Sequence, residues 1–305
     1  MIDELEQRAI ASLKLASAMS QEYYSKPLII TYSGGKDSEV LLDLALRADI
    51  EFEAINNHTT ADAPQTVYHI HEKFYELDQR GIHTEIIKPS YKGKPVSMWS
   101  LIPQKSMPPT RLVRYCCAVL KEQSASNRYI ATGVRAAESV SRSRRAAFEV
   151  LGKTAKMRLN FTYTHAAEVY ADAHRHDEIW DCKLISSAKQ HKKLVCNPII
   201  DWADTDVWRY IYDRKIKYNP VYNRGYFRVG CIGCPLATYR MRLKEFSDFP
   251  AYKQMYIHAF DRMLEVKAAA GKNTKWRSGE DVFAWWIGEN PNQISIFDAM
   301  MEESK

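Results

Sequence analysis

Short runs of β-branched and aliphatic residues alternate with longer amphipathic patterns along the first half of the chain. We expect strands at 28–32, 51–55, 84–87 and 129–133 from these runs. Apolar residues recur at helical spacing over 1–24, 38–46, 63–80 and 204–214, with Gly81 closing the third of these helices. Strands that alternate with helices predict βαβ units, so we expect an α/β fold around a mostly parallel sheet.

Other segments carry weaker patterns. Residues 89–115 are rich in proline and have little periodicity, which predicts a loop, and 150–195 are polar and rich in His and Lys. A long helix is expected over 250–270. The aromatic cluster around Trp285 and Trp286 could pack in a core or dock a partner, and we favour packing. We predict an N-terminal helix (1–24), one α/β domain (25–240) and a helical C-terminal extension (241–305).

The composition is that of a folded protein, with 46% hydrophobic and 26% charged residues. The sequence contains no uninterrupted run of about 18 apolar residues, so we expect no membrane-spanning helix. The first ten residues, MIDELEQRAI, are acidic, whereas a secretory signal begins with basic residues. We therefore expect a cytoplasmic protein that does not contact membranes. Six cysteines are too few for a disulfide scaffold, so metal or redox ligation is the better interpretation.

Positive charge is concentrated in the middle of the chain. The net charge is −5 over residues 1–100, +9 over 101–200 and +2 over 201–305. The excess lies around seven arginines, Arg111, Arg114, Arg128, Arg135, Arg142, Arg144 and Arg145. A nucleotide or DNA partner would favour such a bias, and a solvated basic face is the alternative.

The segment from Ser33 to Ser38, Ser-Gly-Gly-Lys-Asp-Ser, has the pattern of a phosphate-binding loop between a strand and a helix. Gly34 and Gly35 let the backbone turn tightly, and the N–H groups that open the helix form an anion site. Lys36 would add positive charge, and the hydroxyls of Ser33 and Ser38 would donate hydrogen bonds. Asp37 could hold Mg²⁺ between phosphates. The common GxxxxGK[S/T] spacing is absent, so this is another kind of phosphate loop.

Further candidates follow the second and fourth strands, at the edge of the sheet where parallel sheets bind ligands. Asp62 could contact ribose or Mg²⁺. Gly133 ends the fourth strand, and Arg135, Glu138 and Arg142 follow it. The arginines would hold the α-phosphate or stabilise departing pyrophosphate, and ion pairing to Glu138 is the alternative.

Four cysteines form two close pairs, Cys116–Cys117 and Cys231-Ile-Gly-Cys234. Four thiolates suit a structural zinc or an iron–sulfur cluster. Adjacent ligands are uncommon in zinc sites, which favours the cluster. Cys182 and Cys196 lie outside these pairs and are better explained as packing residues.

These segments, in this order, resemble those of the adenine-nucleotide alpha-hydrolase superfamily, the ATP pyrophosphatases, and within it the phosphoadenosine phosphosulfate (PAPS) reductase branch. The resemblance spans about residues 25–240. Its matching segments are the loop at Ser33–Ser38, residues 58–65, 114–121, 133–139 with Arg142, 197–202 with 206–208, 219–225, and Gly230-Cys-Ile-Gly-Cys-Pro235. It implies a parallel-sheet HUP-like fold, ATP and Mg²⁺ at the loop, and a [4Fe–4S] cluster on the two cysteine pairs.

The reductases of this branch use a nucleophilic cysteine in a Glu-Cys-Gly-Leu-His motif, and no cysteine follows Cys234 here. The combination of a nucleotide site, a cluster and a basic middle resembles the ATP pyrophosphatase of DNA phosphorothioation systems, of the DndC and SspD types. That resemblance implies adenylation of a DNA phosphate, sulfur from a cysteine desulfurase, and partnership with other phosphorothioation proteins. The alternatives are an atypical PAPS or APS reductase using Cys182 or Cys196, a tRNA-thiolating enzyme, and a non-catalytic nucleotide sensor that binds DNA.

Overall fold

The computed structural model describes residues 2–122, 124–139, 142–151, 156–159 and 193–288. Its chain contacts define two compact units, each assembled from separate segments. Unit 1 comprises 1–57, 64–87 and 123–229, and unit 2 comprises 58–63, 88–122 and 230–305. The boundaries of these units do not coincide with the domain boundaries expected at 24/25 and 240/241, and the expected boundaries stay predictions.

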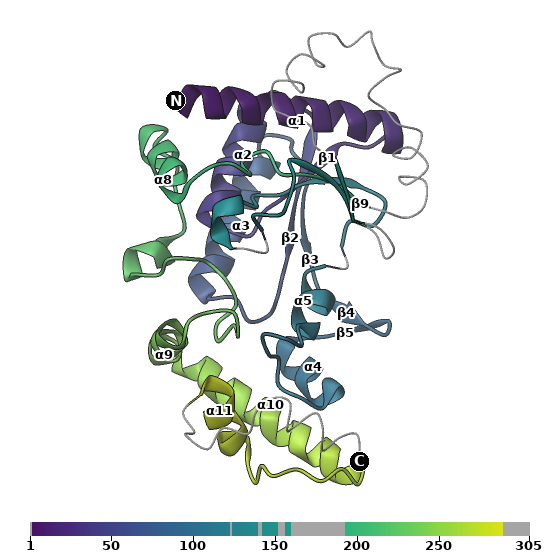
Figure 1. The fold of residues 1–305 in the computed structure, drawn as a ribbon, viewed down its shortest axis with the longest axis vertical. Coiled ribbons are helices and arrows are strands. Elements are labelled where there is room, and N and C mark those ends of the chain that lie inside the picture. The colour runs from purple at the N-terminus through teal and green to yellow at the C-terminus, as the bar shows by residue number, and fades with distance from the viewer. Residues whose placement is uncertain (1, 123, 140–141, 152–155, 160–192, 289–305) are drawn as a thin grey trace. The chain divides into compact units, whose positions relative to one another are not determined.

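Unit 1 is built on a seven-stranded sheet (Figure 1). The strand order is β3 (Thr84–Ile87), β2 (Phe52–Asn57), β1 (Leu28–Thr31), β6 (Tyr129–Ala131), β9 (Lys193–Cys196), β7 (Phe148–Leu151) and β8 (Lys156–Leu159). The first five strands are parallel, whereas β7 runs antiparallel to β9 and to β8. The α/β fold with a mostly parallel sheet is confirmed. The strands β7 to β9 had no sequence prediction.

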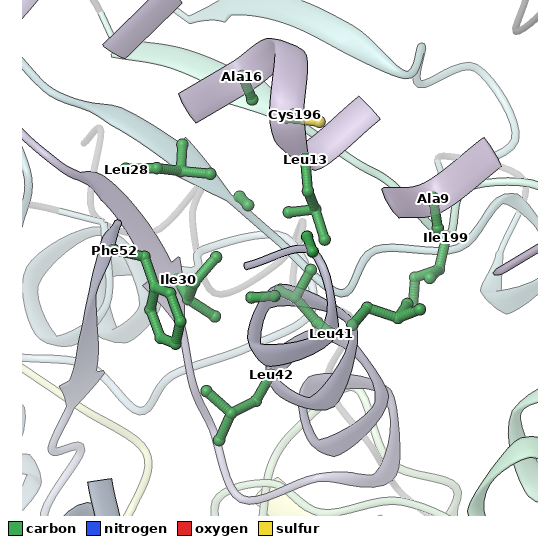
Figure 2. Packing of buried hydrophobic residues seen from close by; sticks show 14 of the residues in the cluster. Ala9, Leu13, Ala16, Leu28, Ile30, Leu41, Leu42, Phe52, Cys196 and Ile199 are labelled. Carbon is green, nitrogen blue, oxygen red and sulfur yellow. The ribbon is translucent and has the colours of Figure 1, made fainter. Parts of the chain in front are cut away.

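The helices of unit 1 begin close to the predicted positions. They are α1 (Ile2–Tyr24), α2 (Lys36–Arg47), α3 (Pro64–Asp78) and α8 (Asp204–Asp213), with 3-10 turns η1 (Ala136–Glu138) and η2 (Pro220–Arg224). Figure 2 shows how Leu13 of α1 and Leu41 of α2 meet side chains of the sheet, such as Ile30. These residues are fully buried, and burial of this kind stabilises the layered arrangement by about 1.5–3 kcal/mol per side chain.

Unit 2 is mainly helical. It contains α4 (Met98–Lys105), α5 (Tyr115–Leu120), α9 (Tyr239–Asp248), α10 (Pro250–Ala269) and α11 (Gly279–Ile287), with a small hairpin of β4 (Ser90–Tyr91) and β5 (Lys94–Pro95). The buried ring of Trp286 lies 4.6 Å from the ring of Tyr256 and 5.4 Å from that of Phe260. Its indole N–H donates to the carbonyl of Pro109. The favoured packing role of the aromatic cluster is therefore confirmed.

The loop expected over 89–115 is wrong in part, because this segment holds the β4–β5 hairpin and α4. Ser97 caps α4 by accepting the N–H of Ser100, and Leu101 and Ile102 are buried. Pro103 lies inside the helix, and this residue type is what made the segment look irregular. Among the described helices, none combines the length and the hydrophobicity needed to cross a membrane.

Candidate functional site

The loop between β1 and α2 has the backbone of a phosphate site. Gly34 has a φ of +71°, which only glycine adopts readily, and Gly35 caps α2. The Ser38 hydroxyl accepts the N–H groups of Ser33 (3.2 Å) and Gly35 (3.1 Å), which closes the loop on itself. The loop is thus held by its own hydrogen bonds, with the opening turn of α2 at its base.

Two distant segments hold this loop in place. The amide of the fully buried Asn219 donates to the carbonyl of Gly34 (2.9 Å) and to the hydroxyl of Thr66. At Gly133, after β6, an added Cβ would lie 2.9 Å from the carbonyl oxygen of Asp37. A side chain there would therefore collide with the backbone of α2, so glycine permits this close approach.

The charged residues of the loop form one network. The Lys36 ammonium lies 3.0 Å from Oδ1 of Asp204 and 3.4 Å from Oδ2 of Asp37. The guanidinium of Arg135 bonds Oδ1 of Asp37 (2.5 Å) and Oδ1 of Asp204 (2.8 Å). The predicted site residues Lys36, Asp37 and Arg135 are therefore brought together, and Asp204 joins them from the first turn of α8.

Burial and charge set the ionisation of this network. The Lys36 and Arg135 side chains are only 6% and 3% exposed, whereas the Asp204 side chain is 60% exposed. Burial alone would raise the pKa of Asp204, but the hydrogen bond and charge of Lys36, with the charge of Arg135, hold it below its ordinary value. Burial alone would lower the pKa of the Arg135 guanidinium, and the charge of Asp37 raises it instead. Both partners are thus held in their charged forms.

Glu138 and Arg142 extend the network outward. Glu138 accepts the backbone N–H of Arg135 (3.0 Å) and forms an ion pair with Arg142. Arg142 is exposed, so it reaches the loop through Glu138 and Arg135 rather than through a contact of its own with Lys36. The alternative of ion pairing to Glu138 therefore holds for Arg142, whereas the Arg135 side chain pairs with Asp37 and Asp204.

The opening turn of α2 has a further partner. The backbone N–H of Lys36 donates to the hydroxyl of Tyr222 (2.9 Å). Tyr222 belongs to η2 and packs edge-to-face on Trp208 of α8, with ring centroids 5.1 Å apart. Burial raises the pKa of the Tyr222 phenol, so this hydroxyl stays protonated.

In unit 2, Asp62 lies beside a cysteine pair. Its backbone forms a β-bridge with Cys231, and its carboxylate accepts the N–H of Thr59 (3.0 Å). Sequence reasoning assigned Asp62 to the nucleotide, and within unit 2 its neighbours belong to the cysteine pair instead. A nucleotide role for Asp62 stays a prediction.

The Cys231–Cys234 turn is tightly packed. Gly233 has a φ of +74°, and an added Cβ would lie 2.5 Å from the Phe246 ring. The Gly233 N–H donates to the buried carboxylate of Glu245 (2.7 Å), and the N–H of Cys234 donates to the carbonyl of Cys231 (3.2 Å). This turn is therefore held in place by contacts with the aromatic core of unit 2 and by the Glu245 carboxylate.

Cys116 and Cys117 open α5 in the same unit. The hydrogen bond with Cys117, then burial and the charges of Cys117, Cys231 and Cys234, raise the pKa of Cys116. The hydrogen bond from Cys116 lowers the pKa of Cys117, assisted by Arg114 against the effect of burial. The four predicted ligands thus interact electrostatically within one unit.

The donor set of two thiol pairs fits an iron–sulfur cluster in number and chemistry. In the described part of the chain, however, no three His, Cys, Asp or Glu side chains are grouped closely enough to hold a metal ion. Side chains of this set would therefore have to turn toward a common centre on loading.

The arginines behind the predicted basic surface are largely engaged within the protein. Arg128 pairs with Glu53, Arg145 with Glu149, and Arg111 donates to the carbonyls of Pro235 and Ala237. With Arg135 and Arg142 also paired, the excess of positive charge in the sequence is a weaker indication of a polyanion partner than its size suggests.

The two remaining cysteines are Cys182 and Cys196. Cys196 is fully buried in the core (Figure 2). Its thiol lies 3.7 Å from the carbonyl oxygen of Ser12. Burial raises its pKa, so it is a poor nucleophile at neutral pH. Cys182 lies outside the described residues.

Sequence reasoning missed three residues of this site, Asp204, Asn219 and Tyr222. Asp204 was seen only as the start of a capped helix, and the other two only as part of a matching segment. All three lie more than 160 residues from the loop that they contact. The sequence does show a lysine in the loop, Lys36, and an acidic residue at the start of a later helix, Asp204. Their separation in the chain does not reveal that they form an ion pair.

Comparisons with known proteins agree on a family. The model of the phosphoadenosine phosphosulfate reductase domain matches residues 27–237. The adenosine 5′-phosphosulfate reductase of Allochromatium vinosum is 25% identical over 77% of this chain and 77% of its own length. Two uncharacterized proteins of Methanocaldococcus jannaschii are 24% and 25% identical, and the chain spans about half of their length, 53% and 44%.

Solved structures with similar folds include two enzymes. The PAPS reductase from Candida auris has a TM-score of 0.41 at 16% identity and covers 75% of this chain and 93% of its own. The U34-tRNA thiolase from Methanococcus maripaludis, solved with its [4Fe-4S] cluster, has a TM-score of 0.36 at 11% identity and covers 91% of this chain and 82% of its own.

Proposed function

Because the chain belongs to the phosphoadenosine phosphosulfate reductase domain family, we propose that it is an ATP pyrophosphatase that activates an acceptor for sulfur transfer. The observation that carries this proposal is the closed Ser33–Ser38 loop, whose cations Lys36 and Arg135 are buried within one compact unit. Buried cations fixed beside a helix N-terminus suit a polyphosphate.

The roles of the residues follow from their placement. The N–H groups of the loop and the Ser33 and Ser38 hydroxyls would bind the phosphates of ATP. Lys36 and Arg135 would stabilise the charge that develops on pyrophosphate as an acceptor oxygen attacks the α-phosphorus. Asp37 would hold Mg²⁺, which neutralises phosphate charge. Arg142 would act through Glu138 by fixing the backbone of Arg135.

The four thiols of Cys116, Cys117, Cys231 and Cys234 would hold a [4Fe–4S] cluster. Bound there, a cluster would supply a sulfur-binding metal centre. The chain's own contribution is a turn that Gly233 and Glu245 keep fixed and a guanidinium, Arg114, that lies 3.5 Å from the Cys117 sulfur. Positive charge beside a thiol favours the thiolate that a metal binds.

We further propose that the acceptor is a DNA backbone phosphate. Its oxygen would displace pyrophosphate from ATP. The terminal sulfur of a persulfide supplied by a cysteine desulfurase would then attack the adenylated phosphorus and release AMP, and a thiol reductant would supply the two electrons that cleave the resulting S–S bond and leave the thiophosphate. This step rests on the sequence resemblance. The burial of Cys196 argues against a reductase that uses this thiol, because a reductase needs an accessible nucleophile and Cys196 lies in the core.

The test is to incubate anaerobically purified protein with α-labelled ATP, with and without duplex DNA. We expect AMP and pyrophosphate, with more of both when DNA is present. Lys36→Ala should lower the rate by about 100-fold or more, whereas Lys26→Ala, a change at an exposed lysine outside the site, should not alter it.

Other products would identify the alternatives. Formation of ADP would contradict cleavage at the α-phosphorus. Sulfite from PAPS or APS with thioredoxin would identify a reductase, and thionucleosides in tRNA would identify a tRNA-thiolating enzyme. ATP binding without cleavage under every condition would indicate a nucleotide sensor.

A further inference from the structure

The donor groups of the phosphate loop are already engaged by one other segment of unit 1. Asp204 at the start of α8 places a single carboxylate oxygen 3.0 Å from the Lys36 ammonium and 2.8 Å from the Arg135 guanidinium. Tyr222 of η2 accepts the backbone N–H of Lys36. These are the groups that a bound phosphate would use, if the proposed function is right.

We infer that Asp204 and Tyr222 act as an internal substitute for phosphate, which the nucleotide must displace, so that these two residues set the affinity of the loop for polyphosphates. This inference rests on the proposed binding of ATP at the loop. Asp204 and Tyr222 would compete with the phosphates for the same donor groups, and the proposed function does not require this competition.

The net charge of this network indicates that Asp204 opposes the binding of a polyphosphate rather than assisting it. Lys36 and Arg135 carry two positive charges, and Asp37 and Asp204 carry two negative ones, so the network is neutral overall. A polyphosphate that approaches a neutral network gains little attraction. Once the Asp204 carboxylate has moved away, the same groups carry a net charge of +1.

Exposure indicates which partner can move. The two cations are 6% and 3% exposed and are therefore fixed by packing, whereas the Asp204 side chain is 60% exposed. It can rotate into solvent without opening the core. Asp37 lacks this freedom, since it is 19% exposed and belongs to the opening turn of α2 itself.

The two substitute groups are linked through one aromatic side chain. Trp208 lies one helical turn after Asp204 on α8, on the same face, and its ring packs against Tyr222. A displacement of α8 that withdraws Asp204 would therefore also disturb the Tyr222 hydroxyl. Rotation of the Asp204 side chain alone, in contrast, would leave the Tyr222 hydroxyl in place.

The experiment is calorimetric titration of the whole chain with inorganic pyrophosphate in the presence of Mg²⁺. Asp204→Asn should bind about three- to tenfold more tightly than the unchanged chain, the range expected for removing a partly exposed charge. Tyr222→Phe, which removes only the hydroxyl, should bind about two- to fivefold more tightly. Asp206→Asn is the matched control, because Asp206 caps the same helix by accepting the N–H of Ala203; its affinity should stay within twofold.

The outcomes separate the inference from the proposed function. Unchanged or weaker binding by both Asp204→Asn and Tyr222→Phe would overturn the inference, because these groups would then assist the ligand or have no part in binding. Binding by Asp204→Asn alone, with none by the unchanged chain, would support it. No binding of pyrophosphate or ATP by any variant would overturn the proposed function as well. If thermal unfolding shows that Asp204→Asn does not fold, the affinity of Tyr222→Phe for pyrophosphate alone tests the inference.

Discussion

The phosphate loop and the cysteine turn are both glycine-containing turns, yet they differ in how complete they are without a ligand. In the loop, Lys36, Asp37, Arg135 and Asp204 satisfy one another, and Ser38 closes the backbone. In the cysteine turn, the backbone is fixed by Glu245 and aromatic rings, but the described thiols do not form a metal-holding group. The phosphate loop must give up ion pairs within the chain when it binds a polyphosphate. The cysteine turn instead gains metal–thiolate bonds when it binds a cluster.

The largest expected effect would come from removing a thiol from the incomplete site. Cys231→Ser should strongly reduce retention of a reconstituted [4Fe–4S] cluster, because the cluster would then lack one of its four proposed thiolate ligands. Iron content and absorbance near 400 nm after anaerobic reconstitution measure this, with Cys196→Ala as the control outside the set. If Cys231→Ser keeps a full complement of iron, the proposed ligand set is wrong. Binding of ATP should persist in both variants if the two sites are independent.

A pair of glycine substitutions would sharpen the same contrast. Gly133→Ala places a methyl group 2.9 Å from the backbone of Asp37, and Gly233→Ala places one 2.5 Å from the Phe246 ring. Each should cost about 1–3 kcal/mol of unfolding free energy through overpacking, and Gly233 adds strain at its positive φ. We expect Gly133→Ala to weaken nucleotide binding and Gly233→Ala to weaken cluster retention.

Denaturant titrations with both ligand assays check this pair. Gly81→Ala is the control, since its Cβ would meet nothing within 4 Å and only its positive φ of +77° causes strain. If either substitution impaired both functions equally, the two sites would not be separable in the way described.

The smallest effect concerns pH. The pKa of Asp204 is lower in the folded chain than its ordinary value, so its ionised form stabilises the fold. This contribution is complete above the ordinary aspartate pKa of about 3.9 and is lost as the pH falls through the lower folded value. Because the side chain is largely exposed, we expect less than about 1 kcal/mol. The difference in unfolding free energy between the unchanged chain and Asp204→Asn should therefore be larger at pH 7 than at pH 3; an equal difference at both would contradict this.

The sequence predicted the parts of the fold that depend on local patterns. The strands β1, β2, β3 and β6 and the helices around them follow from short apolar runs and helical spacing. The segment 89–115 was mistaken for a loop because Pro103 lies inside α4, where burial of Leu101 and Ile102 outweighs the preference of proline. The strands β7 to β9 are short and flanked by a polar region, so their pattern carried little information.

The candidate site was predictable where its residues are adjacent in the chain, as in Ser33–Ser38. Asn219 and Tyr222 were not, because only the fold brings η2 to the loop. The basic middle of the chain was a misleading signal for the same reason: Arg128 and Arg145 meet their acidic partners through ion pairs that a charge count leaves out.

The division of unit 2 among three chain segments also has a consequence for how the protein is made. Cys116 and Cys117 leave the ribosome 114 residues or more before Cys231. At translation rates of about 5–20 residues per second, the first thiol pair waits roughly 6–23 seconds for the second. During that interval the thiols at the start of α5 have no partners from the later turn, and a four-cysteine centre can be assembled only after nearly the whole sheet of unit 1 has been synthesised. Insertion of a cluster would thus be one of the last steps in maturation, and oxidation of the early pair would be the hazard that precedes it.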